Sequence, residues 1–283
     1  LLYGSDLDVV FVYSDSLDAR TTGPKSISTH EFFVKLAQRI ISVLTLRTRE
    51  GFVFNIDARL RPSGSSGPLV ISREAFLGYH ASKTQVWERQ AIVRARPVAG
   101  DLEFGKEVLN GLFELAYGKP LTPEDIDEMY RIRKRMEVEI ANETPSSYNI
   151  KTGRGALVDI EFLAQSLQLR WGLEKKSLRT PYTVKALLRL KKEGLLNEED
   201  YSFLKEAYSF YRLLDARIRI VHDRPEGYLN EGSEELNTLS RRAGYTGPDP
   251  GARLLKDYRF FSDKVRELYN TNLNALKATG GKV

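Results

Sequence analysis

The stretch that decides the fold occupies residues 4–13 and reads Gly4-Ser5-Asp6-Leu7-Asp8-Val9-Val10-Phe11-Val12-Tyr13. The apolar run over residues 9–13 predicts a buried strand. Alternate residues of a strand point to the same face, so we expect the carboxylates of Asp6 and Asp8 to converge. Two carboxylates on one face raise each other's pKa unless a cation lies between them, and Mg²⁺ prefers such hard oxygen ligands. A turn capped by Asp before a buried strand is the simpler alternative.

Gly4 and Ser5 precede this carboxylate pair directly. Because Gly has no Cβ, the backbone N–H groups at this point can approach a phosphate closely. Metal-binding carboxylates beside a phosphate-binding turn are typical of nucleotidyl transfer, so these residues predict that chemistry.

A second strand is predicted over residues 52–58, and it ends in Asp57-Ala58-Arg59-Leu60-Arg61. Alternation places Asp57, Arg59 and Arg61 on one face of an extended segment. If this strand lies beside the first, Asp57 becomes a third carboxylate, and three carboxylates can hold two Mg²⁺ ions about 3.5–4 Å apart. One carboxylate could also deprotonate an acceptor hydroxyl. Arg59 and Arg61 would then bind a polyphosphate through their planar guanidinium groups. A surface strand of alternating charge is the alternative.

The chain changes character near residue 100. Before it, the pattern predicts helices over residues 30–48, 73–81 and 87–96 and a flexible Gly-Ser loop over 62–68. After it, apolar residues recur at helical spacing almost to the end. We therefore expect an α+β fold with a catalytic domain over residues 1–100 and a helical bundle over 101–283. The predicted helices of the bundle span 101–116, 123–142, 157–172, 181–193, 197–222, 232–243 and 250–277.

One segment of the second part is extended and bears glycine, at residues 146–155. Its basic turn enters a helix whose first turns carry Asp159 and Glu161. Acidic residues near a helix N-terminus interact favourably with the helix dipole, which is one explanation. The other is that Lys151 and Arg154 reach a nucleotide from the second domain.

The composition restricts the classes of function. The 283 residues are 41% hydrophobic and 29% charged, with a net charge of +5, which suits an anionic ligand. The chain has no Cys, which excludes disulfides and thiolate zinc sites, and only three His, so a metal must bind mainly to carboxylates. No apolar run approaches the roughly 20 residues that span a bilayer, and no basic tail favours nucleic acid. We expect a cytoplasmic protein without a membrane or nucleic-acid partner. The chain opens without Met at the motif, so we also expect a fragment whose upstream part is missing.

Four motifs in this order resemble the glutamine synthetase adenylyltransferase family. They are Gly4–Tyr13, Ile56–Gly64, Trp87–Arg96 and Gly153–Phe162. That family belongs to the DNA polymerase β-like nucleotidyltransferases, and its members carry two related catalytic halves. The resemblance implies that Asp6, Asp8 and Asp57 are the metal carboxylates, and that Gly4 and Ser5 begin the phosphate-binding turn.

The resemblance also implies a reaction and its partners. We expect Mg²⁺-assisted transfer of AMP from ATP to a tyrosine hydroxyl of glutamine synthetase, in the regulation of nitrogen assimilation. A PII-type regulatory protein is a further expected partner. The runs Asp57–Gly64 and Val221–Arg224 favour the adenylylating half. The runs Gly67–Val70, Trp87–Arg89 and Asn149–Lys151 favour the half that removes AMP by phosphorolysis and releases ADP. A non-catalytic docking fragment is the third alternative.

Overall fold

Short strands and long helices make up this α+β chain. The computed structural model describes residues 5–14, 19–51, 54–222 and 227–279. The described strands are β1 Leu7–Asp8, β2 Phe11–Tyr13, β3 Ile56–Asp57, β4 Val70–Ser72, β5 Ser147–Asn149 and β6 Tyr228–Asn230. The described helices are α1 Thr29–Thr45, η1 Gly64–Ser66, α2 Arg73–Ser82, α3 Val86–Val93, α4 Leu102–Tyr117, α5 Pro123–Arg135, η2 Met136–Ile140, α6 Leu157–Trp171, η3 Lys176–Leu178, α7 Thr183–Lys192, α8 Glu198–His222, α9 Glu234–Arg242 and α10 Pro250–Thr279.

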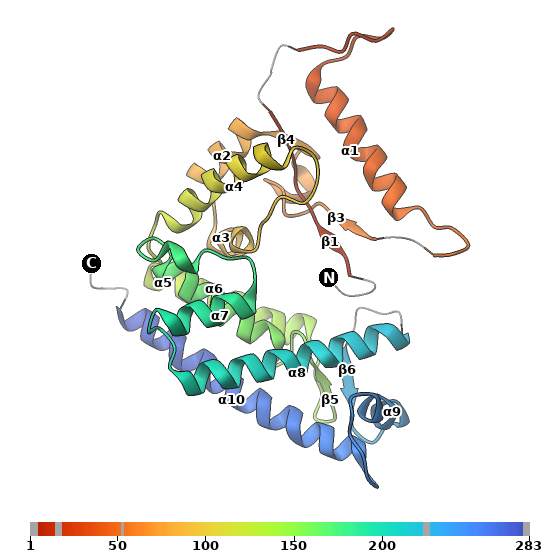
Figure 1. Ribbon diagram of the computed structural model, residues 1–283, viewed down its shortest axis with the longest axis vertical. Coiled ribbons are helices and arrows are strands. Elements are labelled where there is room, and N and C mark those ends of the chain that lie inside the picture. Colours follow the sequence, from red (N-terminus) through yellow and green to blue (C-terminus); the bar gives the residue numbers. More distant parts are fainter. Residues whose placement is uncertain (1–4, 15–18, 52–53, 223–226, 280–283) are drawn as a thin grey trace.

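The helices confirm the periodic pattern of the sequence. Each predicted helical stretch contains an α-helix whose ends differ from the prediction by a few residues. One difference changes the geometry: the helix predicted over 123–142 ends at Arg135, and Met136–Ile140 continue it as a π-helical turn, η2. In Figure 1 the elements before α5 lie at one end of the molecule and the elements from α5 onward at the other.

The strand predicted over residues 9–13 is confirmed for Phe11–Tyr13, which form β2. A separate strand, β1, precedes it across Val9 and Val10, because the two strands pair with different partners. β1 runs parallel to β3, whereas β2 runs parallel to β4. The strand predicted over 52–58 is confirmed for β3 alone, and residues 52–53 lie outside the described part of the chain. β4 was not predicted, although its Val70 and Ile71 are buried.

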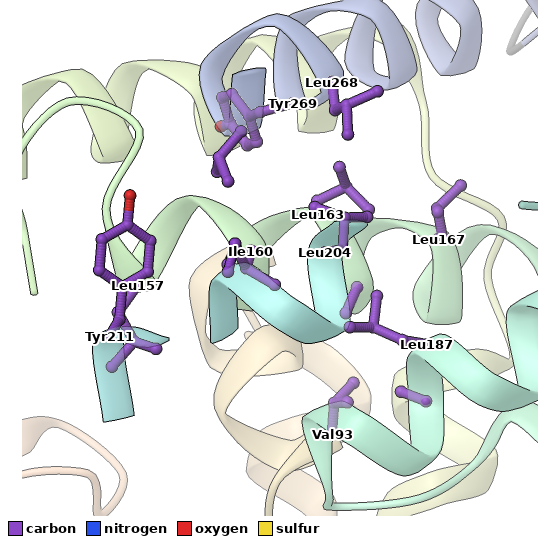
Figure 2. Packing of buried hydrophobic residues seen from close by; sticks show 14 of the residues in the cluster. Val93, Leu157, Ile160, Leu163, Leu167, Leu187, Leu204, Tyr211, Leu268 and Tyr269 are labelled. Carbon is purple, nitrogen blue, oxygen red and sulfur yellow. The ribbon is translucent and has the colours of Figure 1, made fainter. Parts of the chain in front are cut away.

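Helix α6 is the centre of the hydrophobic core. It packs against α10, α3, α7 and α8 and buries apolar side chains on every side. Figure 2 shows Ile160, Leu163 and Leu167 of α6 among apolar side chains of its neighbours, including Leu204 of α8 and Leu268 of α10. The same core continues without a break from Ile71 to Leu276, across the expected domain boundary. The division near residue 100 therefore stays a prediction.

Helix α1 packs on a second, smaller hydrophobic core. Ser28 caps it by accepting a hydrogen bond from the Glu31 N–H at 3.2 Å. Its Ala37 packs with Tyr13 of β2 and Val70 of β4. The helix thus covers the β2–β4 pair. Its other face is exposed and apolar, with Phe32, Leu36, Ile40 and Val43 spaced along one side. None of the described helices is long and apolar enough to cross a membrane.

A cluster of buried charges fixes the start of α6 against α5 and α10. The Arg133 guanidinium is fully buried and pairs with the fully buried Asp159 carboxylate. Arg266 of α10 lies 2.9 Å from the other oxygen of Asp159 and also pairs with Glu137 of η2. Since a buried charge is costly without a partner, each member depends on the others.

We predict that Arg133→Met destabilises the protein by about 3 kcal/mol, because it leaves buried carboxylates with one cation fewer. Met keeps most of the apolar volume, so the loss reports the charge. Urea unfolding followed by circular dichroism measures it. Arg131→Met on the same helix is the matched control, because Arg131 is 65% exposed in its pair with Glu128, and it should cost less than about 1 kcal/mol. Equal stability of the two variants would refute the role of the cluster.

Candidate functional site

The β1–β3 pairing brings two of the predicted site residues together. Asp8 and Asp57 are direct neighbours in the parallel register. The Leu7 and Val9 N–H groups fix this register by donating to the Asn55 and Asp57 carbonyls, each at 2.8 Å. The structure therefore brings the first and second carboxylate motifs side by side, as the sequence predicts.

Asp6 lies beside the same pair. It lines an open hollow of about 410 Å³ together with Asn55, Ile56, Asp57, Ala58 and Arg59. Asn55 was missed in the sequence, although it lies two residues before Asp57 in an extended segment, where alternation places both on one face. Ser5 is half-buried just before β1, and Gly4 lies outside the described residues.

The carboxylates of the site lie close enough to one another to interact repulsively. Desolvation raises the pKa of the Asp8 carboxyl above its usual value, and the Asp57 carboxylate raises it further, with Asp6 adding to the effect. The cations Lys151 and Arg59 oppose this shift. A cation bound among these carboxylates would relieve their repulsion. Among the described residues, however, no three His, Asp or Glu side chains are arranged as a ready metal-binding group.

Arg59 forms an ion pair with Asp57, one of the three predicted carboxylates. Its Nε lies 2.9 and 2.8 Å from the two carboxylate oxygens of Asp57, and its own N–H donates to Oδ1 of Asp57 at 2.8 Å. The side-chain hydrogen bond from Arg59 holds the pKa of Asp57 below its usual value. The Arg59 side chain is 76% exposed, so water can replace this contact easily. Arg59 therefore lies at the site, where its guanidinium contacts the Asp57 carboxylate.

Arg61 organises the neighbouring loop. Its guanidinium donates to the backbone carbonyls of Ala58 at 2.6 Å, Gly67 at 3.1 Å and Ser65 at 3.2 Å. A Cβ at Gly67 would lie 2.0 Å from the Pro62 carbonyl oxygen, so the turn closes only with glycine there. The Gly-Ser segment, expected to be flexible, is a turn that is already folded around Arg61.

Two basic residues outside the β1–β3 pair act electrostatically on Asp8. Arg94, just after α3, pairs with Glu161 of α6 at 2.7 Å. This pair and the Asp8 carboxylate raise the pKa of Arg94 against the effect of burial. Arg154 instead pairs with Asp263 of α10 at 2.6 Å, and Asp159 belongs to the buried cluster. Of the basic residues at 151 and 154, Lys151 is therefore the one whose charge acts on Asp8.

Two family sequence models match different parts of this chain. Residues 1–111 match the sequence model of a family described as glutamate-ammonia ligase adenylyltransferase. Residues 124–273 match the model of the PII-uridylyltransferase family.

Similar curated proteins from three bacteria share the name bifunctional glutamine synthetase adenylyltransferase/adenylyl-removing enzyme. The protein of Rhodopseudomonas palustris is 34% identical over 91% of this chain and 26% of its own length. That of Thioalkalivibrio sulfidiphilus is 39% identical over 74% of this chain and 22% of its own length. That of Rhizobium meliloti is 36% identical over 87% and 25%. The chain thus spans about a quarter of the length of these relatives. Taken with the paired carboxylates of β1 and β3, these matches show that the chain belongs to the glutamine synthetase adenylyltransferase/adenylyl-removing enzyme family.

Proposed function

We propose that this chain transfers AMP from ATP to a tyrosine hydroxyl of glutamine synthetase. The observation that carries the proposal is the register of β1 and β3, which sets Asp8 beside Asp57 with Asp6 on the same hollow. Family membership supplies the nucleotide and the protein substrate. The parallel β1–β3 pairing also supports a DNA polymerase β-like nucleotidyltransferase fold.

Asp6, Asp8 and Asp57 are the residues that would hold Mg²⁺. Their oxygen donors suit this hard cation. Burial raises the pKa of Asp8 most, and the neighbouring Asp57 and Asp6 carboxylates add a repulsion that a cation would relieve. The fit requires Arg59 to leave Asp57, which its exposure allows. When bound, Mg²⁺ would neutralise charge that develops on the phosphate oxygens during transfer.

The chain's own residues prepare the reaction. The tyrosine oxygen attacks the α-phosphorus of ATP, the bond from that phosphorus to the pyrophosphate breaks, and a proton leaves the hydroxyl. A site carboxylate within hydrogen-bond reach can accept this proton. Arg59, once released from Asp57, can donate to the departing pyrophosphate. Arg61 contributes by holding its loop in one conformation beside the hollow.

Phosphorolytic removal of AMP is the alternative reaction, and it would use the same carboxylates. The name shared by the relatives includes adenylyl removal, in which inorganic phosphate attacks the AMP–tyrosine phosphorus and ADP is released. The match of residues 124–273 to a PII-uridylyltransferase model supports a PII-type regulatory protein as a partner of the helical part. Two assays separate the directions: labelling of glutamine synthetase from α-labelled ATP, and phosphate-dependent ADP release from adenylylated glutamine synthetase.

We predict that Asp8→Asn and Asp57→Asn each lower transfer by at least about 10²-fold, the loss that follows removal of one charged stabilising group. Both residues lie at the edge of short strands outside the core, so circular dichroism and the unfolding midpoint should stay near those of the unchanged protein. Asp263→Asn, an exposed aspartate far along the chain, is the control and should retain activity. Turnover like that of the unchanged protein in either site variant would overturn the proposal.

We predict that Mg²⁺ alone raises the midpoint of thermal unfolding. A cation that binds only the folded state stabilises it by about 2.7 kcal/mol at a concentration 100 times its Kd. The folded-state pKa of Asp8 is raised, so ionised Asp8 costs stability at neutral pH, and acidification through that pKa removes the cost and the cation site together. The Mg²⁺ effect should therefore fade on acidification before ordinary aspartates titrate.

Differential scanning fluorimetry across pH checks this expectation. The Asp8→Asn variant without metal should be at least as stable as the unchanged protein at pH 7, and Mg²⁺ should not stabilise it further. A Mg²⁺ effect of full size in that variant would place the cation elsewhere.

A further inference from the structure

Asn55 lies directly across the β1–β3 pair from the first carboxylate of the site. The parallel register sets Asp8 opposite Asp57. Two residues earlier on each side, Asp6 therefore comes opposite Asn55. The Leu7 N–H donates to the Asn55 carbonyl at 2.8 Å, which holds the Asn55 backbone in this register. Because residues two apart in extended backbone share a face, the amide and the three carboxylates lie on one face of the pair.

The hollow of about 410 Å³ contains the Asn55 side chain. The oxygen-bearing side chains that line it are those of Asp6, Asn55 and Asp57. Asn55 is exposed, and within the part of the chain that the structure describes its side-chain amide makes no hydrogen bond. Asp57, in contrast, is paired with Arg59. The Asn55 amide is therefore available to a ligand that enters the hollow.

The backbone around Asn55 is anchored on both sides. Just before it, the Phe54 N–H donates to the Leu44 carbonyl of α1 at 3.2 Å. Just after it, the Asp57 carbonyl accepts from the Val9 N–H at 2.8 Å. A ligand that binds the amide therefore has to order one short side chain and no backbone, which keeps the entropic cost of binding small.

The amide is uncharged, which suits its position among carboxylates. A fourth carboxylate would add to the repulsion among Asp6, Asp8 and Asp57. A lysine or arginine would pair with a carboxylate, as Arg59 does with Asp57. An amide carbonyl oxygen is a ligand that suits Mg²⁺ and Mn²⁺, and it brings no charge of its own. Asn55 thus adds an oxygen donor to the hollow without adding repulsion.

We propose that the side-chain oxygen of Asn55 is a ligand of the divalent cation, together with the carboxylates of Asp6 and Asp57 that line the same hollow. This inference rests on the proposed function and adds an uncharged ligand to its three carboxylates. The side-chain nitrogen of the same amide then points away from the cation, because an N–H donor cannot coordinate a metal ion.

The test measures binding of Mn²⁺ alone to the full chain, without nucleotide, from the electron paramagnetic resonance signal of the unbound ion. We expect Asn55→Ala to weaken Mn²⁺ binding at least about 10-fold, the lower end of the loss when a supporting residue of a metal site is removed. Asn55→Asp keeps an oxygen at this position and should bind Mn²⁺ at least as tightly as the unchanged protein. Asn110→Ala, at an exposed position of α4, is the matched control and should bind Mn²⁺ normally.

The outcomes separate this inference from the proposed function. Unchanged Mn²⁺ binding in Asn55→Ala, or weakened binding in Asn55→Asp, would overturn the inference. Weaker Mg-ATP binding in Asn55→Ala with unchanged Mn²⁺ binding would make the amide a donor to the nucleotide and would also overturn it. If the unchanged protein binds no Mn²⁺, the inference fails, whereas labelling of glutamine synthetase from α-labelled ATP still decides the proposed function.

Discussion

The completely buried pair of Arg133 and Asp159 is the interaction on which the rest of the structure depends. It lies where α6 begins, and α6 is the helix around which the core is built. Burial raises the pKa of Asp159, and the charges of Arg133 and Arg266 oppose that rise. A buried ion pair of this kind contributes less to net stability than apolar residues of the same size would. Its value here is positional, because the same guanidinium and carboxylate also hold the backbone of Gly153 and Gly155.

This positional role links the core to the site. The start of α6 fixes the turn that carries Lys151, and Glu161 one turn later binds Arg94 after α3. The strand side supplies the neighbouring carboxylates of Asp8 and Asp57, of which Asp57 is paired with Arg59.

The sequence predicted the helices from local periodicity, and it placed Asp57 beside Asp8 only on the condition that the two strands pair, which the structure confirms. It did not predict the break between β1 and β2, because a change of strand partner depends on Val70 and Ile56, which are far along the chain. Arg59 and Arg61 share a face by alternation, yet Arg59 turns back onto Asp57 and Arg61 turns into its own loop. Local spacing gave the direction of these side chains but not their nearest acceptors.

The charge cluster was beyond prediction for the same reason. Asp159 near a helix start suggested dipole capping, and only folding brings it against Arg133 and Arg266.

Asp57 illustrates the consequence for function. Its partner is Arg59, which lies two residues away and is exposed. In the site, Asp57 is therefore paired with the Arg59 cation, whereas Asp8 is repelled by neighbouring carboxylates. Binding of a metal and a polyphosphate would resolve both at once, because the metal takes the carboxylates and the phosphates take the arginine. The Arg59–Asp57 contact is exposed and weak, so its exchange for stronger contacts with a metal and a polyphosphate would cost little.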